Sequence, residues 1–108
     1  MSSDKLLNLL GLAKKAGVII IGTDGLIKNF SKVKLIFLAF DASVATKDKI
    51  IKKAFFYHVP IIDKYHSETI SQAIGKSKIK LVSITDQGFS KKMLELVFQE
   101  KEVITYEG

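Results

Sequence analysis

Residues 22–28 carry the groups in this sequence that are best suited to hold an anion. The segment GTDGLIK follows a β-branched run and opens a helical pattern. A glycine-containing turn from strand to helix presents free backbone N–H groups where the helix dipole favours negative charge. Lys28 lies one turn further on and can reach a phosphate held there. Asp24 has two interpretations: it accepts hydrogen bonds from base amino groups, or it starts the helix together with Thr23.

Asp41 and Asp86 suggest a second kind of chemistry, because each comes at the end of an apolar run that predicts a strand. If the two strands are parallel, ligands gather at their carboxyl ends. The pair would then make a phosphoacceptor or a magnesium-dependent α/β domain. The alternative is that both carboxylates cap the helices that follow. No further acidic residue lies beside Asp41, so we expect no metal and no cofactor.

The loop after Gly75 places Lys76, Lys78 and Lys80 around the apolar Ile79. Beside a nucleic acid, the lysines would contact phosphates while Ile79 packed on a base or a sugar. The alternative is that this is an ordinary loop that binds no ligand. The nucleic-acid interpretation becomes stronger only if the loop lies near residues 22–28 in the fold.

Composition favours a polyanionic partner. The 108 residues form one domain with 47% hydrophobic residues, which excludes a disordered polycation. Residues 1–94 hold 16 lysines against 7 acidic residues, a net charge of +9, and residues 95–108 carry −3. We expect nucleic acid as the partner, and the alternative is a protein-interaction module that binds an acidic protein. All positive residues are lysine, which suits phosphates better than the bidentate reading of guanine.

Several classes of protein are excluded by what the sequence lacks. Without cysteine there is no disulfide scaffold, no thiolate zinc site and no cysteine nucleophile. The longest apolar run, residues 35–40, is too short to span a bilayer, and the N-terminus lacks the unbroken apolar stretch of a signal peptide. We therefore expect a cytoplasmic domain with no membrane partner.

Helices and strands are predicted to alternate along the whole chain. Residues 18–21, 35–40, 59–62 and 80–85 have the β-branched and apolar character of strands, and 18–21 and 35–40 are expected to be buried. Five helical patterns lie before, between and after them. In the third, we expect Ile50, Ile51, Ala54 and Phe55 to face inward and Lys47, Lys49, Lys52 and Lys53 outward. The pattern predicts an α/β sheet with helices on both faces.

Six segments, in order, carry a resemblance to a known family. They are 9–17 (LLGLAKKAG), 22–28 (GTDGLIK), 41–50 (DASVATKDKI), 57–60 (YHVP), 74–76 (IGK) and 82–89 (VSITDQGF). With them the chain resembles the kink-turn-binding ribosomal protein superfamily, which includes archaeal box C/D and eukaryal large-subunit proteins. It is most similar to the bacterial YlxQ-like branch. The resemblance covers about residues 5–98 of the single domain 1–108.

This resemblance implies a three-layer α/β/α sandwich around a mixed four-stranded sheet. It also implies RNA binding at one end of the fold. We expect a non-enzymatic, monomeric protein that binds ribosomal or other structured RNA, as part of the ribosome or another ribonucleoprotein. The implied RNA-binding residues fall in three segments: Gly22, Thr23, Asp24, Gly25 and Lys28; Asp41, Ala42 and Ser43; and Gly75, Lys76, Ser77, Lys78 and Ile79. The sequence departs from the archaeal pattern at Asp24, where that pattern has Asn, and at Gly25, where it has Glu.

Overall fold

Strands β4 (Leu81–Ile84) and β2 (Leu35–Leu38) form the centre of the sheet, with β1 (Ile19–Ile21) beside β4 and β3 (Ile61–Ile62) beside β2. β4 runs antiparallel to β1 and β2, whereas β2 and β3 are parallel. This computed structural model describes residues 4–99. The mixed four-stranded sheet implied by the resemblance is confirmed.

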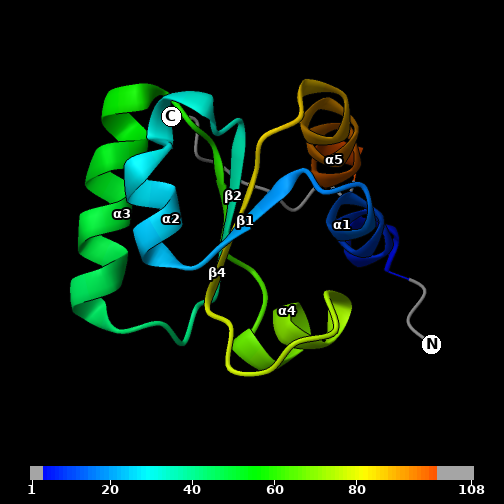
Figure 1. Ribbon diagram of the computed structural model, residues 1–108, viewed down its shortest axis with the longest axis horizontal. Coiled ribbons are helices and arrows are strands. Elements are labelled where there is room, and N and C mark those ends of the chain that lie inside the picture. Colours follow the sequence, from blue (N-terminus) through cyan, green and yellow to red (C-terminus); the bar gives the residue numbers. More distant parts are fainter. Residues whose placement is uncertain (1–3, 100–108) are drawn as a thin grey trace.

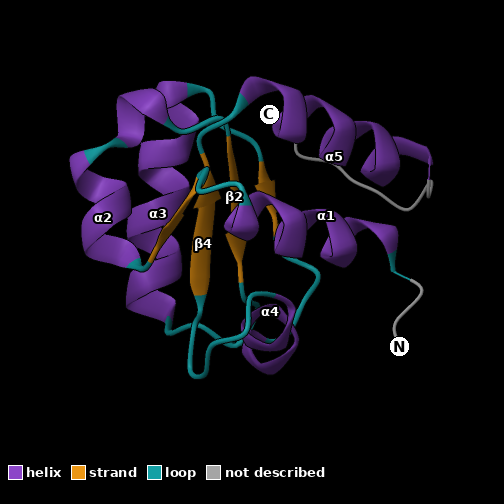
Figure 2. Cartoon of the chain, turned by 45° about the vertical axis from the view of Figure 1, so that its right-hand side comes forward, coloured by secondary structure: helices purple, strands orange, loops and turns teal. Residues whose placement is uncertain are grey.

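Helices cover both faces of this sheet. They are α1 (Lys5–Lys15), α2 (Thr23–Lys28), α3 (Val44–Tyr57), α4 (Ser67–Ala73) and α5 (Gln87–Gln99), with a 3-10 turn at Phe30–Lys32. Figures 1 and 2 show α2 and α3 on one face and α1, α4 and α5 on the other, which makes the expected three layers. No helix within residues 4–99 is long and apolar enough to cross a membrane.

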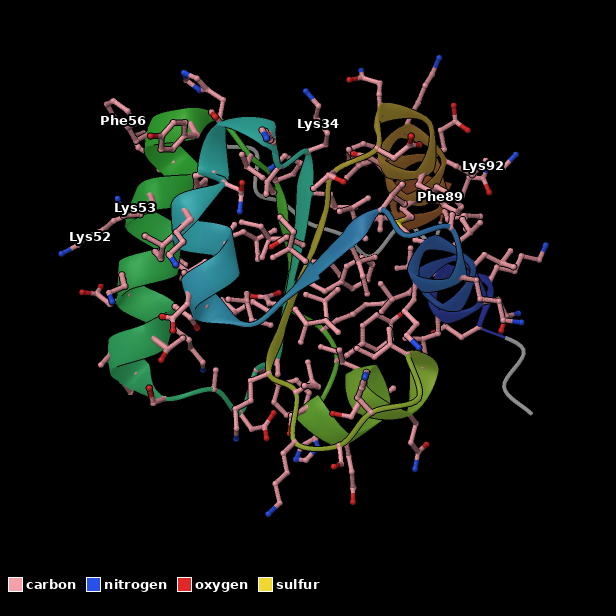
Figure 3. The ribbon with its side chains drawn as sticks, in the orientation of Figure 1. Lys34, Lys52, Lys53, Phe56, Phe89 and Lys92 are labelled. Atoms are coloured by element: carbon pink, nitrogen blue, oxygen red, sulfur yellow. The ribbon has the colours of Figure 1, made fainter. Side chains whose placement is uncertain are left out.

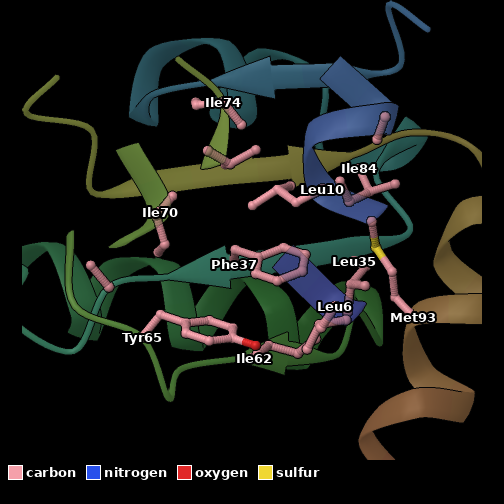
Figure 4. Packing of buried hydrophobic residues seen from close by; sticks show 13 residues of the cluster. Leu6, Leu10, Leu35, Phe37, Ile62, Tyr65, Ile70, Ile74, Ile84 and Met93 are labelled. Carbon is pink, nitrogen blue, oxygen red and sulfur yellow. The ribbon is translucent and has the colours of Figure 1, made fainter. Parts of the chain in front are cut away.

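The pleat of β2 divides the core between the two faces. Alternate side chains of a strand point to opposite sides, so Leu35 and Phe37 pack towards α1, α4 and α5, and Ile36 and Leu38 towards α2 and α3. Figure 4 shows Phe37 in the middle of the first cluster. All four residues of β2 and all four of β4 are buried, as expected for strands covered on both faces.

Local sequence signals set the ends of the helices. The side chains of Asp4, Ser43 and Asp86 each accept hydrogen bonds from first-turn amides of α1, α3 and α5, at 2.9 to 3.1 Å. Gly17, with φ of 76°, ends the turn after α1 in a conformation that glycine adopts without strain. The prediction that Asp86 caps the last helix is confirmed.

Two predictions of burial are wrong. The run 18–21 forms an edge strand that is only partly covered, with Ile21 36% exposed, because β1 pairs with β4 alone. In α3, Ile50 and Ala54 face the sheet, but Ile51 and Phe55 are 49% and 74% exposed. Successive helical residues point about 100° apart, so each follows a buried neighbour but points well away from the sheet.

Candidate nucleic-acid interface

Three loops that are distant in sequence meet around the first residues of β4. The backbone N–H of Gly22, after β1, donates to the carbonyl oxygen of Leu81 at 2.9 Å. The N–H of Ala39, after β2, donates to the carbonyl oxygen of Lys80 at 2.9 Å. Because β4 is antiparallel to both neighbours, its start lies beside their ends, and the loop 75–79 leads directly into it (Figure 1). The sheet therefore brings the three predicted segments to one edge, which we call the loop edge.

The first segment leaves a carboxylate free at this edge. α2 begins at Thr23 after Gly22, whose φ of 93° favours glycine, and no side chain caps the helix. Asp24 is exposed and has no hydrogen-bond or ion-pair partner within residues 4–99. Asp24 lies in the first turn of α2, so the prediction that it starts the helix together with Thr23 is confirmed for its position. Its side chain makes no cap, however, and its oxygens are available to a ligand. Lys28, in the last turn of the same helix, is also exposed.

Gly25 is required by the close packing of α2 on β1. A Cβ atom at this position would lie 2.6 Å from Cγ2 of Ile20, well inside van der Waals contact. A side chain at this position therefore requires Ile20 to move.

Asp41 joins the second segment to the rest of the loop edge. Its carboxylate accepts hydrogen bonds from the backbone N–H of Ser67 at 2.8 Å and from the Ser67 hydroxyl at 2.6 Å. It also lies 3.4 Å from Nε2 of His66 and 3.6 Å from Nζ of Lys80. The hydroxyl of Ser67 is the main cause that lowers the pKa of Asp41 to about 2; partial burial opposes it, and the backbone N–H of Ser67 adds a smaller lowering effect. Asp41 therefore binds the first residue of α4, whose N-cap is His66, and does not cap the helix that follows Asp41 in sequence.

The other two members of the second segment have structural partners as well. Ala42 is buried, and its N–H donates to the carbonyl oxygen of Ala39 at 3.1 Å. Ser43 caps α3 through its hydroxyl. The segment as a whole fixes the positions of α3 and α4 at the loop edge.

The third segment is held from beneath by one buried hydroxyl. Ser71, 3% exposed, accepts from the N–H of Ile79 at 2.8 Å and donates to its carbonyl oxygen at 3.2 Å. Gly75 and Lys78 take positive φ values of 68° and 58°, which turn the loop tightly. Lys76, Ser77 and Lys78 are exposed, whereas Ile79 is half-buried and packs on the cluster beneath α4. The lysines face solvent in a loop of defined shape.

The structure adds Lys80, Phe40 and His66 to this edge, none of which the predicted site included. Lys80 contributes an exposed ammonium group beside Asp41. Phe40, expected within a strand, is 49% exposed, and its ring meets the edge of the His66 ring at 5.6 Å between centroids. Phe40 comes one residue before Asp41, at the end of the apolar run, and this position could have indicated that its ring lies at the loop edge.

The magnesium or phosphoacceptor hypothesis fails on strand direction. Asp41 follows β2 and Asp86 follows β4, and these strands are antiparallel, so the carboxylates lie at opposite ends of the sheet. The four paired residues of the two strands, roughly 13 Å in length, lie between the two ends, and both carboxylates lie beyond them. Within residues 4–99 there is no group of three or more His, Asp or Glu side chains that could hold a metal ion.

Known relatives resemble this chain over most of its length. An RNA-binding protein YlxQ of Enterococcus faecium is 41% identical over 95 residues, which cover 86% of this chain and 91% of the relative. An RNA-binding protein YlxQ of Bacillus subtilis (strain 168) is 35% identical over 99 residues, covering 90% and 99%. No family model matches the sequence.

Two solved structures have the same fold. A protein of unknown function from Bacillus halodurans C matches with a TM-score of 0.81 and 33% identity, covering 85% of this chain and 95% of the other. A Giardia lamblia 15.5kD RNA binding protein matches with a TM-score of 0.76, covering 96% and 94%. At 18% identity, the second likeness concerns the fold alone.

Proposed function

The chain belongs to the YlxQ family of RNA-binding proteins, and on this premise we propose that it binds structured RNA at the loop edge and catalyses no reaction. The observation that carries the proposal is the meeting of three loops around Lys80, with exposed polar groups from two of them. Residues from one end of a fold that converge in this way form a surface broad enough for a folded nucleic acid.

Cations at this edge supply attraction to phosphates. Lys28, Lys76, Lys78 and Lys80 are exposed and come from both sides of the start of β4. If about four phosphates are neutralised, the logarithm of affinity falls with the logarithm of salt concentration at a slope near −3 to −4. This attraction alone does not distinguish one RNA from another.

Choice between RNAs must come from other groups. Asp24 has free carboxylate oxygens that accept hydrogen bonds from the amino group of an unpaired or sheared guanine. Phe40 and the exposed part of Ile79 offer apolar surface for a base that is turned out of its stack. Bulges and internal loops of RNA present such bases, whereas a plain duplex does not.

We infer that the target is a kink-turn-like element, recognised through shape and backbone contacts more than through its sheared G·A pairs. Asp24 accepts hydrogen bonds but cannot donate them, and Gly25 offers no side chain. The preference for an intact kink turn over its G·A-disrupted variant is therefore expected to be modest, near the 1 kcal/mol of a single hydrogen bond.

Fluorescence anisotropy with three labelled hairpins tests this function. We expect the kink turn to bind most tightly, its G·A-disrupted variant several-fold more weakly, and a plain duplex of equal length most weakly. Lys76→Ala should weaken binding of the kink turn, while Lys92→Ala, an exposed lysine on α5, serves as the matched control. Equal affinities for all three RNAs would refute recognition of structure, and a salt slope near zero would refute the phosphate contacts.

A further inference from the structure

The solvent face of α3 combines cations with an exposed aromatic ring at regular helical spacing. Lys49, Lys52, Lys53 and Phe56 occupy positions i, i+3, i+4 and i+7, which lie on one side of a helix. All four are exposed, and Phe56 is 74% exposed. Figure 3 shows Lys52, Lys53 and Phe56 pointing away from the body of the protein. We call these four residues the α3 face.

Phe56 is supported by a short series of aromatic rings. It meets the Tyr57 ring at 5.1 Å and 83°, and Tyr57 stacks on Phe30 at 5.1 Å and 18°. Phe30 is only 3% exposed, so this series connects the surface ring to the core. A ring held in this way loses little freedom when a flat group stacks on it, which favours binding.

The cations around this ring are available to an anion. The side chains of Lys49 and Lys53 have no ion-pair partner within residues 4–99. Lys52 lies 3.3 Å from Asp48, but both side chains are more than half exposed, at 77% and 65%. Such a surface pair contributes little energy and is readily exchanged for a phosphate.

From this arrangement we propose that the α3 face is a second RNA contact, which binds an unpaired strand with one base stacked on Phe56 and phosphates on the lysines. The proposal rests on the RNA-binding function above. An unpaired strand needs only a ring face and neighbouring cations. An interface with a protein instead needs a desolvated apolar centre, in which lysine is depleted. The exposed apolar residues Val44, Ile51 and Phe55 lie on the neighbouring side of α3, whereas on the α3 face itself three lysines flank one ring.

The α3 face lies apart from the loop edge. α3 starts at Val44, beside the loop edge, and its twelve-residue rise to Phe56 spans about 18 Å. Figures 1 and 3 show that this rise leads to the opposite end of the sheet. A structured element on the loop edge and an unpaired extension along α3 can therefore be bound together by one molecule.

A tryptophan probe reports base stacking directly, because the protein has no tryptophan of its own. In Phe56→Trp, we expect a single-stranded adenosine oligomer to quench the indole fluorescence. Phe98→Trp is the matched control, since Phe98 is 71% exposed on α5 at the other face of the sheet. Quenching in Phe56→Trp alone supports the proposal. Equal quenching in both variants, or none in either while the oligomer still binds, overturns it.

Affinity measurements separate this proposal from the function on which it rests. Two kink-turn hairpins are compared, one blunt and one with an unpaired adenosine tail. We expect Phe56→Ala to leave the blunt hairpin unaffected and to remove the advantage of the tail, a loss of roughly 5- to 150-fold for one stacked base. Lys49→Ala and Lys53→Ala should each reduce the magnitude of the salt slope for the tailed RNA by about 0.7.

The outcomes are distinguishable. If the tail adds no affinity to the wild-type protein, or if Phe56→Ala binds both hairpins as the wild type does, the α3 face is not an RNA contact, although the loop edge is. An acidic protein would then be the remaining class of partner for this face. If the wild-type protein binds neither hairpin, the proposed function fails and this proposal fails with it.

Discussion

The hydroxyl of Ser71 offers a sharp test of how the loop edge is built. Ser71→Ala removes two hydrogen bonds to the backbone of Ile79, of 2.8 and 3.2 Å, without changing any exposed residue of the loop. Each such bond contributes about 1 kcal/mol net. The variant should therefore lose about 2 kcal/mol of unfolding free energy, which lowers Tm by about 8 °C for a domain of this size.

The same substitution should weaken binding of RNA even though Ser71 is buried and contacts no ligand. Loop 75–79 would have to be ordered again when RNA binds, and 2 kcal/mol corresponds to an affinity loss of at most about 30-fold. Lys76 and Lys78 keep their charges, so the salt slope should stay as in the wild type. A weaker affinity with an unchanged slope is the pattern that identifies loop order as the cause.

Urea unfolding and RNA anisotropy are both measured, with Ser77→Ala as the control. Ser77 lies in the same loop, is exposed, and makes no hydrogen bond to a residue in the range 4–99. We expect its unfolding free energy to stay within about 0.5 kcal/mol of the wild type. If Ser71→Ala and Ser77→Ala unfold at the same urea concentration, the reasoning about the buried hydroxyl is refuted.

Three further predictions concern the other segments of the loop edge. The pKa of Asp41 is lowered to about 2 in the folded protein, so the ionised carboxylate stabilises the fold fully above about pH 4 and no longer does so once the pH has fallen to about 2. The urea midpoints of the wild type and of Asp41→Asn should therefore converge as the pH falls over that range. A difference that stays constant would contradict the assignment. Gly25→Ala gains about 1 kcal/mol of helix propensity, but its Cβ meets Cγ2 of Ile20 at 2.6 Å, which costs about 1 to 3 kcal/mol. We expect a lower Tm than for Gly88→Ala, whose added Cβ meets the Asp86 side chain at the longer distance of 3.2 Å. The opposite order would count against the close packing. Asp24→Asn removes a negative charge beside the bound phosphates, and the repulsion between two such charges is about 1 kcal/mol at 4 Å in water. The affinity for a kink turn should therefore rise about fivefold in anisotropy titrations. A weaker affinity would show that the carboxylate itself is needed.

Patterns within single segments were sufficient to predict the elements of this fold. The alternation of five helices with four strands, a buried strand within 35–40 and the cap at Asp86 all follow from apolar spacing and from the preference of aspartate for helix starts. These signals are local, because a helix turn or a strand is specified by neighbours within a few residues. Orientation within α3 was predicted incorrectly for Ile51 and Phe55, which are exposed.

Contacts between distant segments could not be predicted from patterns. The partner of Asp41 is Ser67, 26 residues away, and nothing in either segment alone indicates the pair. The need for Gly25 depends on how near α2 lies to Ile20, which is a distance set by packing. The family resemblance did anticipate the meeting of the three segments, but not which side chains would be free there and which would be occupied.

The sequence by itself determined the alternation of helices and strands, the lysine-only charge and the three candidate segments. Only the tertiary structure decided that β4 runs antiparallel to β1 and β2. That direction has the larger consequence, because it separates Asp41 from Asp86 and places Gly22, Ala39 and Lys80 side by side. The physical reason is that the direction of a strand depends on which connections can pack over the sheet, and every layer of the protein contributes to that choice.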